Sequence, residues 1–349
     1  MTKDKNILIR NIYYMLAYAF RHFRFNMFEQ IDGERFEDMQ DLFAEILIRS
    51  VSSQIKQGLF RTYIDQEGAL TVIRGKIDLL KTHEVQRNKP MHAYCQYDEL
   101  SFNNLYNQIV KTTLQGLLNC SNISSNRKDS IKHLLRYFVT IDCINFATVH
   151  WNQFVFDGNN KNYLFLVNVC RFVYEEKLMT TENGVHKMRS LSDERMERLF
   201  EKFVLEYYRR WHPETKPRAA QISWNIKNEN SALGILPVMQ TDVMLTIGDR
   251  TLIIDTKYYS QTLQNNFDKL KIHSNNLYQI YTYVTEQDKE RTGRVDGMLL
   301  YAKTQEDIVP DNHVTMDFGN KLYFHTLDLN QDFHNISQQL DNIVNRIRQ

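Results

Sequence analysis

The sequence is poor in the residues that interrupt regular structure, with 12 glycines and 5 prolines among 349 residues. This scarcity argues against a loop-rich chain and favours helices and strands joined by short connections. No run of about 18 apolar residues occurs, so we expect no membrane-spanning helix and no membrane partner. Hydrophobic residues still make up 42% of the chain, which is too many for a disordered protein and enough for about two packed domains.

Cysteine pairs and net charge are also lacking. The four cysteines include no C-x-x-C pair, which argues against a zinc site and fits a reduced, cytoplasmic protein. The net charge of +1 gives no basic surface of the kind that DNA-binding proteins usually carry. Near-neutrality fits a subunit that relies on a partner to hold DNA, and it fits a protein without DNA equally well. A G-x-x-x-x-G-K-[ST] loop is absent, so we do not expect this chain to bind GTP through a P-loop.

What is present divides the chain into two halves. A polar stretch at residues 181–192 predicts a boundary between an N-terminal domain, 1–190, and a C-terminal domain, 191–349. Residues 36–79 pass from helical spacing to the alternation of strands, so we expect an α+β N-terminal domain. In the second half a helix over residues 193–211 precedes strands, a helix and further strands, which is an α/β order.

The most informative segment holds two apolar runs around Gly248 and Asp249, which predict a hairpin with a two-residue turn. Counting outward from this turn places Asp242 opposite Asp255. Opposed residues have Cβ atoms about 4.5–5.5 Å apart, and two carboxylates so close repel each other unless a cation lies between them. Mg²⁺ prefers one or two carboxylates together with retained water, so the pattern predicts a magnesium site.

Lys257 lies two residues after Asp255, and the period of a strand puts both side chains on one face. An amine there can orient the attacking water and offset charge on a phosphate. Thr256 is expected to point away, with its backbone carbonyl free to complete the metal shell. The alternative is a solvated face on which Lys257 is only a counter-charge, but the apolar run Leu252–Ile254 favours a buried strand.

Two further polar side chains follow on the next helix. An apolar stripe of Leu277, Ile280, Tyr281 and Val284 would place Gln279 and Tyr283 on the opposite side. An amide and a phenol four residues apart suit a phosphate or a metal-bound water. Plain exposure to solvent is the alternative.

The helix over residues 193–211 offers one more carboxylate. Glu206 lies at the edge of its apolar stripe and is a candidate metal ligand, whereas Glu201 is expected to point further from that stripe. A surface ion pair between Glu206 and Arg210 is an equal alternative.

The pattern D-x(12)-D-x-K of Asp242, Asp255 and Lys257, followed by Gln279-x-x-x-Tyr283, resembles the RecB-like branch of the PD-(D/E)xK nuclease superfamily. The resemblance implies a restriction-endonuclease-like C-terminal domain. In it the aspartates bind metal, the lysine is catalytic, and the glutamine and tyrosine support them. The family often has a proline before its first aspartate, where this chain has a threonine.

The segment Arg10–Phe20 resembles the opening of the McrC family, nuclease subunits of the McrBC modification-dependent restriction system. Further similarities follow in the same order along the chain: Gly75–Ile77, Asn107–Lys111, Lys202–Tyr207, Thr241–Asp242, Asp255–Tyr259 and Ser274–Gln279.

The McrC resemblance implies a 5-methylcytosine-dependent, GTP-dependent endonuclease that hydrolyses double-stranded DNA with Mg²⁺. Residues 1–190 would dock on a McrB-like hexameric AAA+ GTPase, which binds the GTP, and would stimulate it. Two alternatives stay open. One is a stand-alone RecB-like DNA nuclease in repair or defence, and the other is a non-catalytic assembly factor.

Overall fold

The computed structural model describes residues 5–20, 39–182, 193–226, 236–258, 264–266, 269–303 and 310–347. The chain forms two compact units. Residues 38–178 make one, here called the inserted unit. Residues 1–37 and 179–349 together make the other, here called the terminal unit. Within the described residues, no helix is long and apolar enough to cross a membrane.

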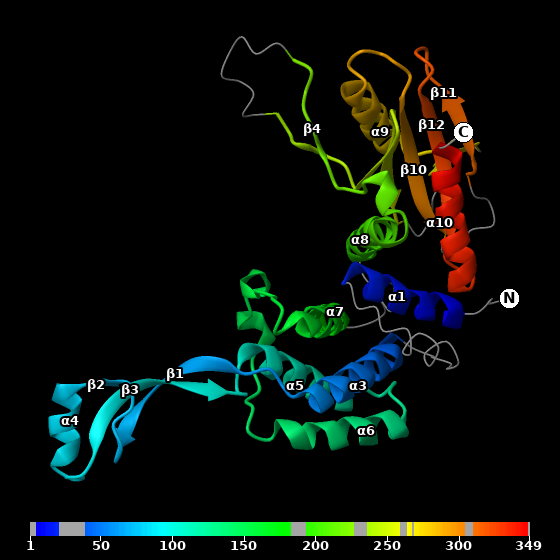
Figure 1. The fold of residues 1–349 in the computed structure, drawn as a ribbon. Helices are drawn as coiled ribbons and strands as arrows, with labels where there is room; N and C mark the ends of the chain where they lie inside the picture. The colour runs from blue at the N-terminus through cyan, green and yellow to red at the C-terminus, as the bar shows by residue number, and fades with distance from the viewer. Residues whose placement is uncertain are drawn as a thin grey trace. The chain divides into compact units, whose positions relative to one another are not determined.

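The terminal unit is a mixed sheet flanked by helices (Figure 1). Its helices are α1 (Lys5–Ala19), α8 (Asp193–Trp211), the 3-10 turn η4 (Pro213–Thr215), α9 (Ser274–Gln287) and α10 (Phe333–Ile347). Its five-stranded sheet, in the order β11-β12-β10-β7-β6, consists of β6 (Val243–Ile247), β7 (Arg250–Lys257), β10 (Val295–Lys303), β11 (Asn312–Thr315) and β12 (Lys321–Asp328). Two separate pairs are β4 (Gln221–Ile222) with β5 (Met239–Gln240), and β8 (Gln264–Asn266) with β9 (Lys269–Lys271).

The strands β7, β10 and β12 run parallel at the centre of the sheet, and β6 and β11 are antiparallel to their neighbours. Parallel strands are usually covered on both faces, which agrees with the long apolar runs of β7 and β10. Helix α9 lies very close to β10. A Cβ atom at Gly297 would be 2.7 Å from side-chain atoms of Ile280 and Val284, so only glycine allows this approach. The α/β order expected for the second half is therefore observed.

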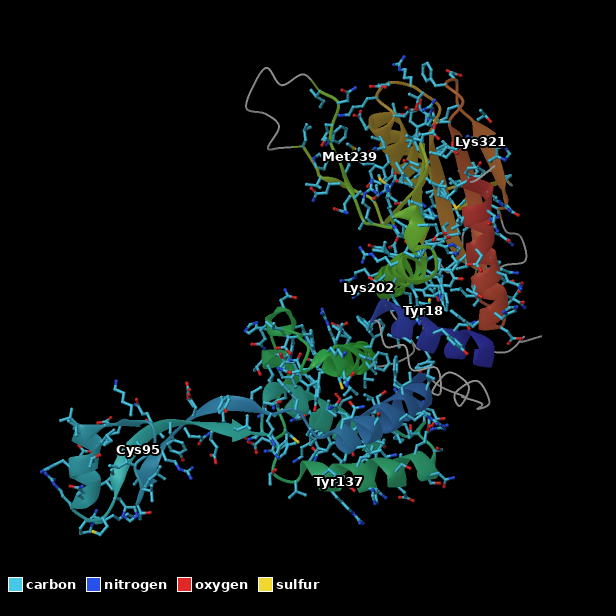
Figure 2. The ribbon with its side chains drawn as sticks, in the orientation of Figure 1. Tyr18, Cys95, Tyr137, Lys202, Met239 and Lys321 are labelled. Atoms are coloured by element: carbon cyan, nitrogen blue, oxygen red, sulfur yellow. The ribbon has the colours of Figure 1, made fainter. Side chains whose placement is uncertain are left out.

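Helix α1 belongs to the terminal unit, although the rest of that unit lies far along the chain. The Asn11 side-chain amide donates a hydrogen bond of 2.6 Å to the carbonyl of Leu329, and Tyr14 stacks on Phe333 with ring centroids 4.2 Å apart. Tyr18 on α1 and Lys202 on α8, both labelled in Figure 2, lie where the two helices pack. This division differs from the expected one into 1–190 and 191–349, because an aromatic helix does not reveal its distant packing partner.

The inserted unit combines helices with a small antiparallel sheet, an α+β composition. Its helices are α3 (Met39–Gln57), α4 (Leu79–Gln86), α5 (Leu105–Leu118), α6 (Ser125–Leu135), α7 (Lys161–Glu182) and the 3-10 turns η1 (Arg136–Phe138), η2 (Phe146–Thr148) and η3 (Trp151–Gln153). The strands β1 (Thr62–Leu70), β3 (Ala93–Ser101) and β2 (Lys76–Ile77), adjacent in that order, are here called the ribbon. Figure 2 labels Cys95, which is buried within it.

The ribbon is held to the helices of its own unit by a hydrogen-bond network. The Asn107 amide donates to the carbonyls of Phe60 and Phe102, just outside β1 and β3. The Tyr163 hydroxyl on α7 donates to Asn107 Oδ1 and accepts from the backbone N–H of Phe60. At the other end of β1, large side chains such as Val72 and Ile73 are exposed.

Candidate active site

The β6–β7 hairpin has the predicted two-residue turn. Ile247 pairs with Arg250, and the ladder continues to Val243 opposite Ile254. Gly248 has a φ of 60°, a conformation that favours glycine in tight hairpin turns. The predicted register is confirmed over these five pairs, and Asp242 lies one residue before the first residue of β6.

The Asp242 carboxylate turns toward β7 in the place where the next strand pair would form. Its Oδ2 accepts hydrogen bonds from the Thr256 backbone N–H at 2.7 Å and from the Thr256 hydroxyl at 2.8 Å. The expectation that the Thr256 side chain points away was wrong. Because β6 has ended, the N–H of Thr256 needs another acceptor, and the hydroxyl joins it on the same oxygen. Burial raises the pKa of Asp242, although the Thr256 hydrogen bonds and Lys257 act against this.

Asp255 is the most constrained carboxylate of the site, with only 1% of its surface exposed. Among the described residues, neither of its oxygens accepts a hydrogen bond of good geometry, and the Lys257 ammonium lies 3.0 Å from Oδ2. Burial, together with the nearby charge of Asp242, raises the pKa of Asp255 to about 7 despite the opposing effect of Lys257. A buried carboxylate in this state needs a cation or a proton.

Lys257 is held between three oxygen atoms from three elements. Its Nζ lies 3.0 Å from Asp255, 3.4 Å from Gln279 Oε1 and 3.6 Å from Glu197 Oε1. Burial alone would lower the pKa of Lys257, but Asp255 and the other carboxylates outweigh it and raise the pKa. The amine is therefore charged and fixed in place.

Gln279 and Tyr283 connect Lys257 to the backbone beside Asp242. The Gln279 amide donates to the Tyr283 hydroxyl at 3.0 Å, and that hydroxyl donates to the carbonyl of Gln240 at 3.0 Å. Tyr283 is buried in the core with Ile280, whereas Tyr281 is half exposed. The predicted apolar stripe was therefore wrong for these tyrosines, because the ring of Tyr283 packs inward while its hydroxyl reaches the polar chain.

Helix α8 brings two carboxylates to the site, and Glu206 is not one of them. Glu206 forms an ion pair of 2.7 Å with Arg209. It lies nine residues after Glu197, which is half a turn around the helix. Glu201 follows Glu197 by one turn on the same side. Burial and the charges of Asp242 and Glu197 raise the pKa of Glu201 to about 7.

Sequence reasoning expected Glu201 to point away and overlooked Glu197. The four-residue spacing of these glutamates was the available signal. It carried little weight, because the edge of the stripe that faces the sheet is decided by tertiary packing.

The donor set fits a hard divalent cation. Carboxylate oxygens are the ligands that Mg²⁺ prefers, and the oxygens of Asp255 are the atoms that would coordinate such an ion. Within the described part of the chain, no three histidine, cysteine, aspartate or glutamate side chains form a ready-made metal cage. An ion bound here would keep several water molecules, as Mg²⁺ usually does.

The fold and site define a class: a mixed α/β protein with a buried Asp–Asp–Lys site at the end of a central strand. The chain belongs to the family of McrBC 5-methylcytosine restriction system components, whose model matches residues 2–302. The resemblance of the sequence to the McrC family is thereby confirmed.

One curated protein and one solved structure are similar to this chain. It is 25% identical over 337 residues, covering 96% of both chains, to the Escherichia coli protein described as type IV methyl-directed restriction enzyme EcoKMcrBC. Its fold is similar, with a TM-score of 0.59 and 16% identity, to a chain of the refined half-complex from a tetradecameric assembly of Thermococcus gammatolerans McrB AAA+ hexamers with bound McrC. That likeness covers 97% of this chain and 76% of the other, and it shows the fold.

Proposed function

We propose that this chain is the nuclease subunit of its restriction system, a Mg²⁺-dependent DNA endonuclease of the PD-(D/E)xK class. The observation that carries the proposal is Asp255, a buried carboxylate near Asp242 whose close cationic neighbour, among the described residues, is the Lys257 ammonium at 3.0 Å. Such an arrangement is costly unless a cation completes it, and it matches the motif of that class.

The residues take distinct parts in this proposal. Asp242 and Asp255 would hold Mg²⁺, with the Thr256 carbonyl and Glu201 as candidate further oxygen donors. When bound, the ion polarises the phosphoryl oxygen and lowers the pKa of its water. Lys257 orients the attacking water and offsets charge on the scissile phosphate.

Gln279 and Tyr283 are supporting residues. Their hydrogen-bond chain runs from the lysine to the backbone of Gln240, so it fixes Lys257 relative to the segment that carries Asp242.

The partner is proposed to be a McrB-like hexameric AAA+ GTPase, which binds the GTP. The support is family membership, the relative described as McrB hexamers with bound McrC, and the absence of a P-loop in this sequence. The inserted unit offers exposed apolar side chains on the ribbon, its loop and α4, which suit protein contact. They are Tyr63, Val72, Ile73, Leu79 and Leu80.

All four cysteines are free thiols, in agreement with a cytoplasmic protein.

The test is to purify the chain with its GTPase partner and to assay cutting of methylated and unmethylated DNA. We expect cutting that needs GTP, Mg²⁺ and cytosine methylation. Asp255→Ala and Lys257→Ala should abolish cutting but preserve partner binding and GTPase stimulation. Cutting by the chain alone with Mg²⁺ would favour a stand-alone nuclease, and no cutting under any condition would reject the enzyme.

A further inference from the structure

The site gathers several carboxylates around Lys257. Four carboxylates, Asp242, Asp255, Glu197 and Glu201, surround Lys257 or act on one another electrostatically. Two come from the β6–β7 hairpin and two from α8. The hairpin pair, with Glu201 as a further oxygen donor, is the proposed ion site, which leaves the role of Glu197 to be explained.

Lys257 and a divalent cation both need the same oxygen atoms. The ammonium lies 3.0 Å from Asp255 Oδ2, one of the oxygen atoms that would coordinate the ion. Two positive groups sharing one carboxylate repel each other, and in a partly buried site this repulsion is weakly screened. Unless the lysine has a second anionic partner, ion binding would displace it from the position where it serves catalysis.

Glu197 is placed to be that second partner. Its Oε1 lies 3.6 Å from Lys257 Nζ, and it approaches from α8 rather than from the strand that carries Asp255. Its side chain is 33% exposed, against 1% for Asp255, so Glu197 can stay beside the ammonium at the solvent edge of the site while the inner carboxylate takes the ion. Gln279 also touches the ammonium, but its amide is neutral and supplies no counter-charge.

We propose that Glu197 is a positioning residue that retains the Lys257 ammonium when a divalent cation occupies Asp255, so that lysine and ion coexist instead of competing. The inference rests on the proposed nuclease function and adds a residue that the Asp–Asp–Lys motif does not contain.

The decisive measurement is Mn²⁺ affinity, followed by electron paramagnetic resonance in a double-mutant cycle of Glu197→Gln and Lys257→Met. In the otherwise unchanged protein, Glu197→Gln leaves the ammonium on Asp255 alone and weakens Mn²⁺ binding on the order of tenfold, an ordinary size for coupled sites. In the Lys257→Met background the competitor is gone, and the effect shrinks to about twofold or less. An equal loss in both backgrounds would mean that Glu197 acts on the ion itself and would overturn the proposal, as would no loss in either.

Controls separate this inference from the proposed function. Glu290→Gln removes an exposed carboxylate beyond the end of α9 and should leave Mn²⁺ affinity unchanged. If the original chain binds no Mn²⁺, or if Asp255→Asn binds it equally well, the nuclease proposal itself fails. If those two behave as expected and Glu197→Gln has no effect, only the role of Glu197 is rejected. Thermal melting checks each fold, and Lys257→Gln replaces Lys257→Met if the latter does not fold.

Activity in the complete complex with the GTPase partner gives a second readout. Glu197→Gln should lower kcat for DNA cleavage and raise the Mg²⁺ concentration needed for half-maximal cutting, with KM for DNA unchanged. A change in KM alone would indicate a DNA contact and contradict a positioning role.

Discussion

Two antiparallel strand pairs of this chain set an aspartate opposite an aspartate, with different results. In the ribbon, Asp65 pairs with Asp98, and both side chains are exposed to water. In the β6–β7 hairpin the register leads to Asp242 opposite Asp255, where one carboxylate is half-buried and the other is buried. Water screens the first pair, while burial raises both pKa values of the second. Burial, rather than the pairing of like charges alone, therefore distinguishes the candidate site in the β6–β7 hairpin from the aspartate pair in the ribbon.

The largest expected effect separates these two aspartate pairs directly. Asp255→Asn should abolish Mn²⁺ binding and lower DNA cleavage by at least about a thousandfold, because the ion loses its buried ligand. Asp98→Asn should leave Mn²⁺ affinity unchanged, because the ribbon pair is solvated. Calorimetric titration measures both variants. Equal losses of Mn²⁺ affinity in the two variants would show that burial does not distinguish the two aspartate pairs.

The next effect is on pH dependence. The pKa of Asp255 is raised to about 7 in the folded unit, against an ordinary value of about 3.9. The folded unit therefore binds this proton more tightly than the unfolded chain, and the stability it contributes is lost as the pH rises through about 7. Because an ion must displace the proton, Mn²⁺ affinity should rise up to about tenfold per pH unit below that value and level off above it. Titrations across this range check it, and a flat profile would refute the raised pKa.

The free energy of unfolding should also differ in its response to substitutions in the two strand pairs. Ile253 on β7 is fully buried, so Ile253→Ala should cost about 2–5 kcal/mol of unfolding free energy. Leu100 on β3 is 45% exposed, so Leu100→Ala should cost less than about 1 kcal/mol. Hydrogen exchange of peptides from β7 and β3 reports each unit by itself. Similar losses of unfolding free energy in the two variants would mean that Leu100 is better packed than its exposed fraction indicates.

The smallest effects concern polar contacts beside the β6–β7 hairpin and beside the ribbon. Tyr283→Phe removes the hydroxyl between Gln279 and the Gln240 carbonyl, and cleavage should fall roughly tenfold because Lys257 is less firmly held. Beside the ribbon, Lys81 on α4 pairs with Glu67 on β1 at the surface, and Lys81→Ala should leave the melting temperature unchanged. A clear fall in melting temperature for Lys81→Ala, or unchanged cleavage for Tyr283→Phe, would contradict this distinction.

Local patterns predicted the parts of the fold that depend on neighbours in sequence. The turn at Gly248 fixed the register as far as Val243, because a hairpin of known turn length has one pairing. The helix expected over 193–211 has those bounds, since Asp193 and Pro213 mark its ends. The same face for Asp255 and Lys257 followed from strand period alone, and their 3.0 Å contact confirms it.

Features set by distant packing could not be predicted in the same way. Helical phase could not tell whether the edge of α8 with Glu206 or the edge with Glu201 faces the sheet. It also could not tell that the ring of Tyr283 is inward, because an amphipathic tyrosine suits either environment. The attachment of α1 depends on a hydrogen bond between residues 318 positions apart, beyond any local pattern.

The place of α1 also affects how the protein is made. Ribosomes deliver chains from the N-terminus, so α1 emerges long before Phe333 and Leu329, which it contacts. The inserted unit is translated in full during that interval and can fold first. The core of the terminal unit is completed only after α10 emerges, so a ribosome that stalls earlier releases a chain in which this unit is incomplete.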